Sequence, residues 1–378
     1  MKIVADENIS FAAEAFSQFG NVTLMQGRRI TNESLKDVDA LIVRSITRVD
    51  EELLKNTKVR FVGTATIGTD HIDLKYLKLE NIFFTDAKGC NADAVAEYVF
   101  TSILTLANNL GISIKDKTIG IIGVGNIGSR VNRLANTIGI KVLKNDPPLQ
   151  RERGSNEFIP LDKIFDADII TLHVPLNLEG IDKTVHLLNK ENSKMLKQNT
   201  ILINASRGQV VDNEALLEAV SLKNLNVVLD VWENEPGINT ELLSSVNFGT
   251  PHIAGYSLEG KVNGTTMIYN ALCRFLNQEG KWKPLLPIVE DSIIEVKNSG
   301  SLEKTLYDIF NYVYNIKRDD LQMREILKKT KEEQPRYFDL LRKLYPLRRE
   351  FINYKIRLNK KDDGLINILK AFRFEVIN

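Results

Sequence analysis

The segment Gly123-Val124-Gly125-Asn126-Ile127-Gly128 constrains what this chain can fold into more than any other feature of its sequence. It follows the apolar run Thr118–Gly123 and opens an amphipathic stretch, so it predicts a turn between a buried strand and a helix. In this pattern Gly123 permits the tight turn, Gly125 lets the backbone approach a pyrophosphate, and Gly128 lets the helix pack on the strand. Free N–H groups at a helix N-terminus also stabilise phosphate. We therefore expect a dinucleotide-binding unit, and a glycine-rich turn without a ligand is the alternative.

An acidic residue, Asp146, follows the next predicted strand, Lys141–Asn145. In this position a carboxylate can accept hydrogen bonds from the adenosine ribose hydroxyls, and it repels a 2′-phosphate. The sequence therefore favours NAD over NADP. Arg151 and Arg153 would weaken this preference if they folded back toward the ribose, and a solvated loop carboxylate is the alternative interpretation of Asp146.

Short apolar runs alternate with amphipathic stretches along most of the chain, a pattern typical of parallel sheets with crossover helices. The first series predicts strands at Lys2–Ala5, Val22–Leu24, Ala40–Val43, Arg60–Thr64 and Ile82–Thr85. After a helix at Ala92–Leu110, a second series predicts strands at Thr118–Gly123, Ile140–Lys144, Asp168–His173, Thr200–Asn204 and Val227–Val231, with helices near Asn126–Ile138, Asn192–Leu196 and Glu214–Ser221. The 378 residues exceed what one hydrophobic core usually serves, so we expect an α/β protein of several domains. A third region of different character begins after Pro287.

Composition excludes several classes of function. Lys and Arg total 50 against 49 Asp and Glu, and a formal charge of +1 provides no global field for nucleic acid or a membrane surface. Cys90 and Cys273 are the only cysteines, so we expect neither a disulfide framework nor a thiolate metal site. Acidic residues interrupt the apolar N-terminus by Asp6, which argues against a signal peptide. The expectation is a cytoplasmic protein without a bound metal.

Three loops that follow predicted strands carry residues suited to alcohol oxidation. A base is needed for the hydroxyl proton, and His252 lies just after the last strand of the second series, where ligands of such sheets collect. Glu235 can stabilise an imidazolium, and Arg207 can bind a substrate carboxylate. From the residues alone, a surface ion pair for Arg207 and a solvated acid for Glu235 are equally good interpretations.

The ordered set of these motifs resembles the D-isomer-specific 2-hydroxyacid dehydrogenase family. The matching segments are Gly123–Gly128, His173-Val174-Pro175-Leu176, Asn204-Ala205-Ser206-Arg207-Gly208, Asp230-Val231-Trp232 with Glu235-Pro236, and Pro251-His252-Ile253-Ala254-Gly255. The resemblance implies two Rossmann- or flavodoxin-like parallel-sheet domains around a cleft, plus a smaller α+β C-terminal domain. It implies a substrate (lid) domain at 1–93 and 257–285, an NAD-binding Rossmann domain at 94–256, and a C-terminal dimerisation domain at 286–378.

The same resemblance implies roles for individual residues. Arg207, Glu235 and His252 would be the catalytic trio of a hydride transfer at carbon 2 of a hydroxy acid. NAD would contact Gly123, Gly125, Asn126, Ile127, Gly128, Asp146, Val174, Ala205, Ser206, Arg207, Asp230 and Gly255. Val174 departs from the family pattern, because a hydroxyl residue often stands there; a backbone contact could survive this change, but a side-chain hydrogen bond could not.

Further segments resemble a member of the family that acts on a phosphorylated hydroxy acid, and they imply substrate contacts at Ser45, Thr66 and Tyr256. Arg44 is an additional candidate from its own chemistry, because a phosphate needs positive charge; a surface cation is the alternative. In the C-terminal region Arg348 and Arg349 could approach a phosphate, although a solvated charged helix is the interpretation we favour. Oxidation of 3-phosphoglycerate or another D-2-hydroxy acid, and NADH sensing without catalysis, are the competing functions.

Overall fold

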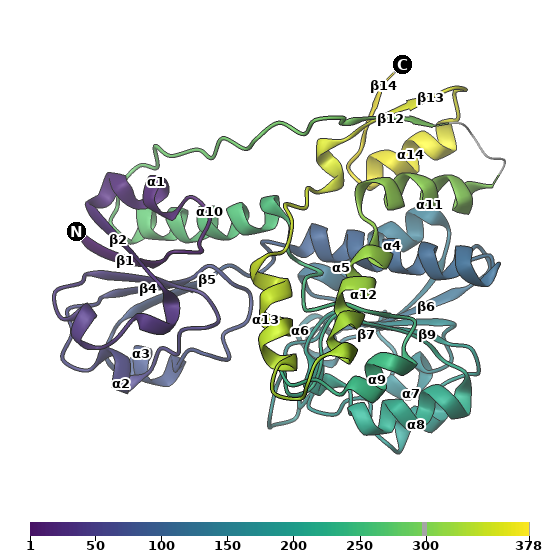
Figure 1. Cartoon of the computed structure of the whole chain (residues 1–378), viewed down its shortest axis with the longest axis horizontal. Coiled ribbons are helices and arrows are strands. Elements are labelled where there is room, and N and C mark those ends of the chain that lie inside the picture. The colour runs from purple at the N-terminus through teal and green to yellow at the C-terminus, as the bar shows by residue number, and fades with distance from the viewer. Residues whose placement is uncertain (297–300, 378) are drawn as a thin grey trace. The chain divides into compact units, whose positions relative to one another are not determined.

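The computed structural model describes residues 1–296 and 301–377 and confirms an α/β protein with parallel sheets (Figure 1). The chain divides into two compact units. The first contains residues 1–91 and 257–288, and the second contains residues 92–256 and 289–378. Within the described residues no helix is both long and apolar enough to span a membrane.

The first unit is a five-stranded parallel sheet with strand order β2-β1-β3-β4-β5. Its strands are β1 (Lys2–Asp6), β2 (Asn21–Met25), β3 (Ala40–Val43), β4 (Phe61–Thr64) and β5 (Phe83–Asp86), and its helices are α1 (Ala12–Phe16), α2 (Glu51–Leu54), α3 (Leu74–Leu79) and α10 (Leu258–Phe275). All four residues of β3 are buried, because α10 and α1 cover one face of the sheet and the α2–α3 segments cover the other. Burial on both faces explains why these strands read as continuous apolar runs.

The second unit contains a six-stranded parallel sheet with strand order β11-β10-β9-β8-β6-β7. Its strands are β6 (Thr118–Ile122), β7 (Lys141–Asn145), β8 (Ile169–Leu172), β9 (Ile201–Asn204), β10 (Asn226–Leu229) and β11 (Phe248–Gly249), and its helices are α4 (Ala92–Leu110), α5 (Asn126–Ile138), α6 (Pro147–Arg153), α7 (Leu161–Ile164), α8 (Asn213–Lys223) and α9 (Thr240–Ser245). The ten strands predicted for the two sheets are present within one or two residues of the expected bounds. The helix predicted at Asn192–Leu196 is instead a short 3₁₀ turn, Asn192–Met195.

The C-terminal residues pack on this second sheet and its helix α4. Their described residues form a three-stranded parallel sheet, β12-β13-β14, with four further helices. These elements are β12 (Ile293–Val296), β13 (Lys355–Leu358), β14 (Glu375–Ile377), α11 (Leu302–Val313), α12 (Ile316–Arg324), α13 (Gln334–Lys343) and α14 (Asp363–Ala371). Aromatic rings of this segment share one hydrophobic core with α4, as the edge-on contact of Phe100 with Phe372 illustrates. That residues 286–378 form a separate dimerisation domain stays a prediction.

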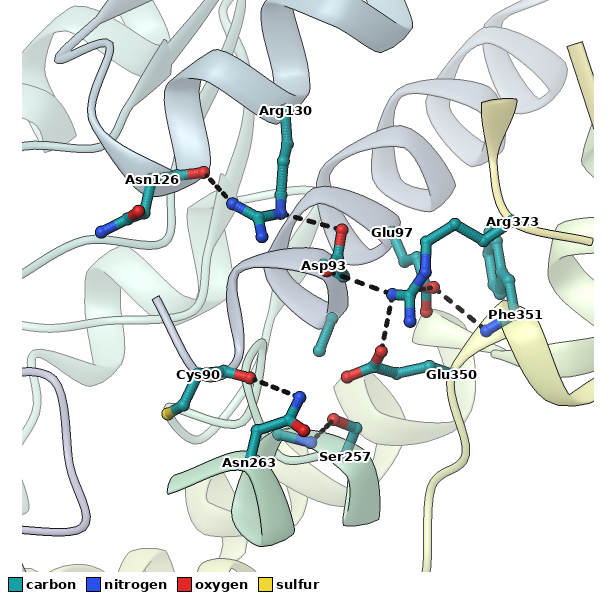
Figure 2. A network of polar contacts seen from close by, with 12 residues as sticks. Cys90, Asp93, Glu97, Asn126, Arg130, Ser257, Asn263, Glu350, Phe351 and Arg373 are labelled. Atoms are coloured by element: carbon teal, nitrogen blue, oxygen red, sulfur yellow. Dashed lines mark hydrogen bonds and ion pairs between the residues drawn. The ribbon is translucent and has the colours of Figure 1, made fainter. Parts of the chain in front are cut away.

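A network of charges reinforces this packing (Figure 2). The guanidinium of Arg373 lies 2.8 Å from Glu350 and 3.3 Å from Asp93, and the Phe351 N–H donates to Glu97 at 3.0 Å. Glu97 is deeply buried, and this burial raises its pKa well above the ordinary value. The C-terminal segment is therefore joined to α4 by the partly buried Arg373–Asp93 ion pair and the Phe351–Glu97 hydrogen bond, as well as by its aromatic core.

The structure corrects one prediction about this segment. Arg348 and Arg349 do not lie on a solvated charged helix, because both are buried and follow the end of α13. Arg348 donates to the carbonyls of Ala94 and Ala254 at 2.7 and 3.1 Å, and its guanidinium lies 4.2 Å from the centre of the Tyr314 ring. These partners allow the charge to be buried.

Candidate active site

The glycine-rich turn has the shape that a dinucleotide requires. Gly123 has a φ of +86°, which favours glycine, and a Cβ at Gly128 would lie 2.0 Å from the Gly123 carbonyl oxygen. A Cβ at Gly125 would meet nothing within 4 Å. Gly125 is the N-cap of α5 and provides no side-chain cap, so open space adjoins the first N–H groups of the helix. This arrangement fits a pyrophosphate.

Asp146 holds this turn in place. Its Oδ2 accepts the Val124 N–H at 2.7 Å, and its Oδ1 caps α6 by accepting the Leu149 N–H at 3.0 Å. Each oxygen keeps a second lone pair that can accept a hydrogen bond from a ribose hydroxyl. That contact stays a prediction. Arg151 pairs with Asp182 at 2.5 Å, and Arg153 lies 3.9 Å from Glu157, so both arginines have carboxylate partners other than Asp146.

The turn is also connected to the charged network on α4. Arg130, one turn into α5, donates to the Asn126 carbonyl at 2.7 Å and to Asp93 at 2.8 Å (Figure 2). Val174 follows β8 and packs against the turn, since a Cβ at Gly123 would approach its methyl group at 2.8 Å. Val174 therefore contributes an apolar contact to the turn, and its own contact with NAD stays a prediction.

The three predicted catalytic residues follow three adjacent strands. Arg207 comes after β9, Glu235 after β10 and His252 after β11, and the carboxyl ends of these parallel strands meet at one edge of the sheet. The loops are packed tightly, because a Cβ at Gly208 would lie 1.9 Å from the Trp232 carbonyl oxygen. The strand order thus brings the three loops to the same edge of the sheet, which sequence spacing alone could not establish.

Glu235 and His252 form a direct hydrogen-bonded pair. Glu235 Oε2 lies 2.8 Å from His252 Nδ1, and Glu235 Oε1 accepts the Trp232 N–H at 2.8 Å. Burial alone would raise the pKa of Glu235, but His252 and the Trp232 N–H oppose it and the pKa is lowered. The carboxylate therefore stays ionised and orients the imidazole through Nδ1, which leaves Nε2 as the nitrogen able to exchange a proton with a substrate.

Asp230 shapes the backbone of the His252 loop, a role that sequence reasoning missed. This fully buried carboxylate accepts the N–H groups of Ile253 and Ala254, both at 2.8 Å, and the Thr250 hydroxyl at 2.6 Å. The Asp230 carbonyl also accepts the His252 N–H at 2.7 Å. His252 itself has a φ of +58°, an unusual conformation for a non-glycine residue that these bonds hold. A contact of Asp230 with NAD stays a prediction.

The Arg207 loop is held by its own side chains. Asn204 accepts the N–H and hydroxyl of Ser206 at 3.1 and 2.7 Å, and its amide donates to the Arg207 carbonyl at 3.0 Å. The Arg207 guanidinium donates to the Ser206 carbonyl at 2.8 Å. Ala205 and Ser206 are buried within this turn. Gly255 is partly buried in the His252 loop. Their NAD contacts are likewise untested expectations.

Other histidines are occupied elsewhere. Desolvation of the partly buried His173 imidazole lowers its pKa to about 3, and its Nε2 lies 3.0 Å from the Thr171 hydroxyl. His186 pairs with Glu233 at 2.6 Å. Neither residue takes part in the Glu235–His252 pair, which agrees with the choice of His252 as the candidate base.

Three predicted substrate residues lie in the first unit. Arg44 is 3.2 Å from the buried carboxylate of Asp6, so it is anchored rather than a loose surface cation, and Ser45 is exposed beside it. The Thr66 hydroxyl lies 2.7 Å from that of Thr64, which in turn lies 3.1 Å from His71 Nε2. Lys261 is a further cation of this unit that was not predicted. Burial of its ammonium group and the charge of Arg44 lower its pKa, and its side chain remains partly exposed.

The fourth predicted substrate residue, Tyr256, ends the His252 loop in the second unit. Its hydroxyl accepts a hydrogen bond from Arg342 at 2.9 Å, and its ring meets Tyr345 edge-on at 6.0 Å. Both partners come from the C-terminal segment. Sequence reasoning did not identify Arg342, because nothing in the local pattern of α13 indicates which residue it reaches.

Comparison with known proteins defines the class. Residues 91–254 match the model of the D-isomer specific 2-hydroxyacid dehydrogenase, NAD binding domain, and residues 285–370 match a domain of unknown function, DUF3410. D-lactate dehydrogenase from Aquifex aeolicus, solved with NAD and lactic acid, is similar over 73% of this chain and 96% of its own, with a TM-score of 0.60 and 27% identity. NAD-bound 3-phosphoglycerate dehydrogenase from Entamoeba histolytica matches over 76% and 99%, with a TM-score of 0.63 and 25% identity. The chain belongs to the D-isomer-specific 2-hydroxyacid dehydrogenase family, a family of NAD-dependent oxidoreductases.

Relatives with greater identity carry a more specific name. The erythronate-4-phosphate dehydrogenase of Serratia proteamaculans is 46% identical over 361 residues, which cover 94% of this chain and 95% of that protein. The enzyme of the same name from Photorhabdus laumondii is 44% identical over 381 residues and covers the full length of both chains. The similarity therefore extends through the C-terminal segment, which the dehydrogenase family model does not cover.

Proposed function

We propose that this chain oxidises 4-phospho-D-erythronate at carbon 2 to 2-oxo-3-hydroxy-4-phosphobutanoate with NAD, a step of pyridoxal 5′-phosphate (vitamin B6) biosynthesis. The observation that carries the proposal is the Glu235–His252 pair, held at 2.8 Å at the edge of the sheet of the NAD-binding unit. Near full-length similarity to erythronate-4-phosphate dehydrogenases supports the substrate.

His252 acts as the general base in this reaction. Its Nε2 takes the proton of the carbon 2 hydroxyl, and the resulting imidazolium is stabilised by the carboxylate of Glu235 at Nδ1. The Trp232 N–H keeps Glu235 oriented and ionised while the charge develops. In the reverse direction the same imidazolium returns the proton to the oxo group. His252, supported by Glu235, therefore serves as the base in one direction and as the acid in the other.

Arg207 binds and orients the substrate carboxylate. A guanidinium suits this task, because its planar donors match a carboxylate and fix the position of the adjacent carbon 2. The rigid Asn204–Gly208 turn limits the motion of the side chain. Arg44, Ser45 and Thr66 of the first unit, with Tyr256, are the proposed contacts to the rest of the substrate.

The glycine turn and Asp146 would hold the cofactor. The open space at Gly125 and the uncapped start of α5 fit the pyrophosphate, and Asp146 fits the adenosine ribose. Asn126, Ile127 and the 205–207 turn would complete the NAD site. When bound, NAD accepts the hydride released from carbon 2.

The test is NADH formation by purified protein with NAD and, separately, 4-phospho-D-erythronate, D-3-phosphoglycerate and D-lactate, with a trap for the oxo product. We expect turnover selective for the first acid. Selective turnover of another acid would keep the family chemistry and reject the substrate. Tight NADH binding without turnover of any acid would instead favour a sensor.

The catalytic assignment has its own test. His252→Ala and Arg207→Ala should retain NAD binding and lose turnover, and wild-type turnover in either variant would refute that assignment. We also propose a cytoplasmic homodimer that forms through residues 286–378. Sedimentation equilibrium of the full chain, which would give a monomer mass if this is wrong, tests the assembly.

A further inference from the structure

Arg342 brings an unassigned positive charge to the His252 loop. It lies in the last turn of α13, donates to the Tyr256 hydroxyl at 2.9 Å, and has its guanidinium carbon 5.6 Å from the centre of the Tyr256 ring. Both residues belong to the second unit. A segment far along the chain thus places a cation beside a residue of the proposed substrate site.

The position of Arg342 is well defined by its surroundings. Tyr345, three residues further on, meets the Tyr256 ring edge-on and donates its hydroxyl to Asp319 at 2.7 Å. Arg348 then fixes the same loop by donating to the Ala254 carbonyl at 3.1 Å. The end of α13 and the chain after it are therefore fastened to the His252 loop at three points.

The hydrogen-bonding capacity of Arg342 is only partly used within the described residues. Its buried Nε has no hydrogen-bond partner there, and its terminal Nη2 donates to the hydroxyl of Tyr256. Burial opposes the charged form, but Tyr256 and Glu235 favour it, and the pKa of Arg342 is raised. Arg342 also helps to lower the pKa of Glu235. A half-buried guanidinium with a spare donor, within electrostatic reach of the catalytic pair, is suited to bind an anion.

We propose that Arg342 binds the phosphate group of the substrate, with Tyr256 as its neighbour in the site. This inference rests on the proposed function, in which the substrate has a carboxylate next to carbon 2 and a phosphate at its other end. Arg207 follows β9 and takes the carboxylate, so a second cation at the His252 loop is matched to the phosphate. Arg348 does not serve this purpose, because it is buried, unlike the half-buried Arg342, and its two terminal nitrogens already donate to the carbonyls of Ala94 and Ala254.

The experiment compares Arg342→Met, Arg342→Lys and the wild type, with Arg336→Met as the matched control. Arg336 is a second arginine on the same helix. Inorganic phosphate and unphosphorylated D-erythronate are each used as competitive inhibitors against the phosphorylated substrate. The first probe reports binding at the phosphate end, and the second reports binding at the carboxylate end.

We expect the inhibition constant of inorganic phosphate in Arg342→Met to rise about 10- to 100-fold, the size of one charge-assisted hydrogen bond. The KM for the phosphorylated substrate should rise in parallel, while the inhibition constant of D-erythronate and the affinity for NAD stay at their wild-type values. Arg342→Lys should recover part of the phosphate affinity, because it restores the charge without the planar donors. Arg336→Met should match the wild type in every measurement.

Equal losses for phosphate and D-erythronate in Arg342→Met would overturn the inference, because they would show that Arg342 only supports the shape of the loop. Unchanged phosphate inhibition would overturn it too. If the wild type does not oxidise 4-phospho-D-erythronate, the proposed function fails instead. Calorimetric titration of inorganic phosphate into the NADH complexes of wild type and Arg342→Met then decides the role of Arg342 independently, and equal affinities would refute it.

Discussion

Replacing Glu235 by glutamine removes one charge from the Glu235–His252 pair and almost no volume. In the wild type the Trp232 N–H donates to Glu235 Oε1 at 2.8 Å. The side-chain carbonyl of the glutamine should accept this hydrogen bond, because the amide NH₂ group would clash with that donor. The NH₂ group must then face His252 Nδ1. Nδ1 becomes an acceptor, so the neutral imidazole carries its proton on Nε2 and cannot take one from the substrate.

The magnitude follows from two losses. The charge-assisted bond to the imidazolium is worth about 1.5–3 kcal/mol, which corresponds to about 10- to 150-fold in rate. The wrong tautomer adds to this loss, and the same change in the aspartate–histidine pair of a serine protease costs about 10⁴-fold. We therefore expect kcat to fall by about 10²- to 10⁴-fold.

The assay is steady-state NADH formation together with the dissociation constant of NAD and the Tm of each variant. Glu233→Gln is a matched control, because Glu233 lies in the same loop and forms a similar pair with His186 at 2.6 Å. We expect Glu233→Gln to retain wild-type kcat and both variants to retain NAD affinity. A kcat of Glu235→Gln within about threefold of wild type, or an equal loss in Glu233→Gln, would refute the reasoning.

Three further predictions concern the second unit. Gly125→Ala should keep the wild-type Tm and weaken NAD binding measured by fluorescence, whereas Gly128→Ala should lower the Tm, because its Cβ would overlap a carbonyl oxygen 2.0 Å away. Burial raises the pKa of Glu97, so its native carboxyl keeps a proton that the unfolded chain loses, and stability falls as pH rises above about 4.3. Glu97→Gln should flatten this slope, by up to about 1.4 kcal/mol per pH unit in urea unfolding at pH 5–8, and an unchanged slope would contradict the assignment. Arg324→Met should lower the free energy of unfolding by about 2–4 kcal/mol, since it leaves the carbonyls of Leu243 and Val246 without a donor, and a loss below about 1 kcal/mol would count against that role.

The sheets and the Glu235–His252 pair could be predicted from sequence for the same physical reason. Strands buried on both faces must be apolar along their whole length, as Ala40–Val43 is. Ile201–Asn204 is also apolar apart from its last residue, Asn204. The residues after such strands gather at one edge of a parallel sheet, so the positions of Glu235 and His252 carry information about their proximity. Local pattern was sufficient for the sheets, whereas the choice of Glu235 as the partner of His252 also depended on the family resemblance.

Contacts that join distant segments could not be predicted in this way. Arg342 and Tyr256 are 86 residues apart, and no periodicity connects α13 with the His252 loop. The prediction for Arg348 was wrong for a related reason: a charge-rich sequence usually marks a solvated face, and only the folded chain reveals the two carbonyls and the ring that bury this arginine. The role of Asp230 was hidden because its partners are backbone N–H groups, which every sequence contains.

The C-terminal segment solves a structural problem posed by the edge strand β11. This strand has only two residues and pairs with β10 on one side, so its outer backbone groups need other partners. Asp320 of α12 accepts the Gly249 N–H at 2.8 Å, and Arg324 donates to the carbonyls of Leu243 in α9 and of Val246 just after that helix. His252 lies three residues beyond this strand, and Arg348 and Arg342 continue the same support along its loop. The segment that covers the sheet edge is therefore the one that holds the catalytic loop, so substitutions of Asp320 and Arg324, whose contacts hold this edge, are expected to affect catalysis without touching the Glu235–His252 pair.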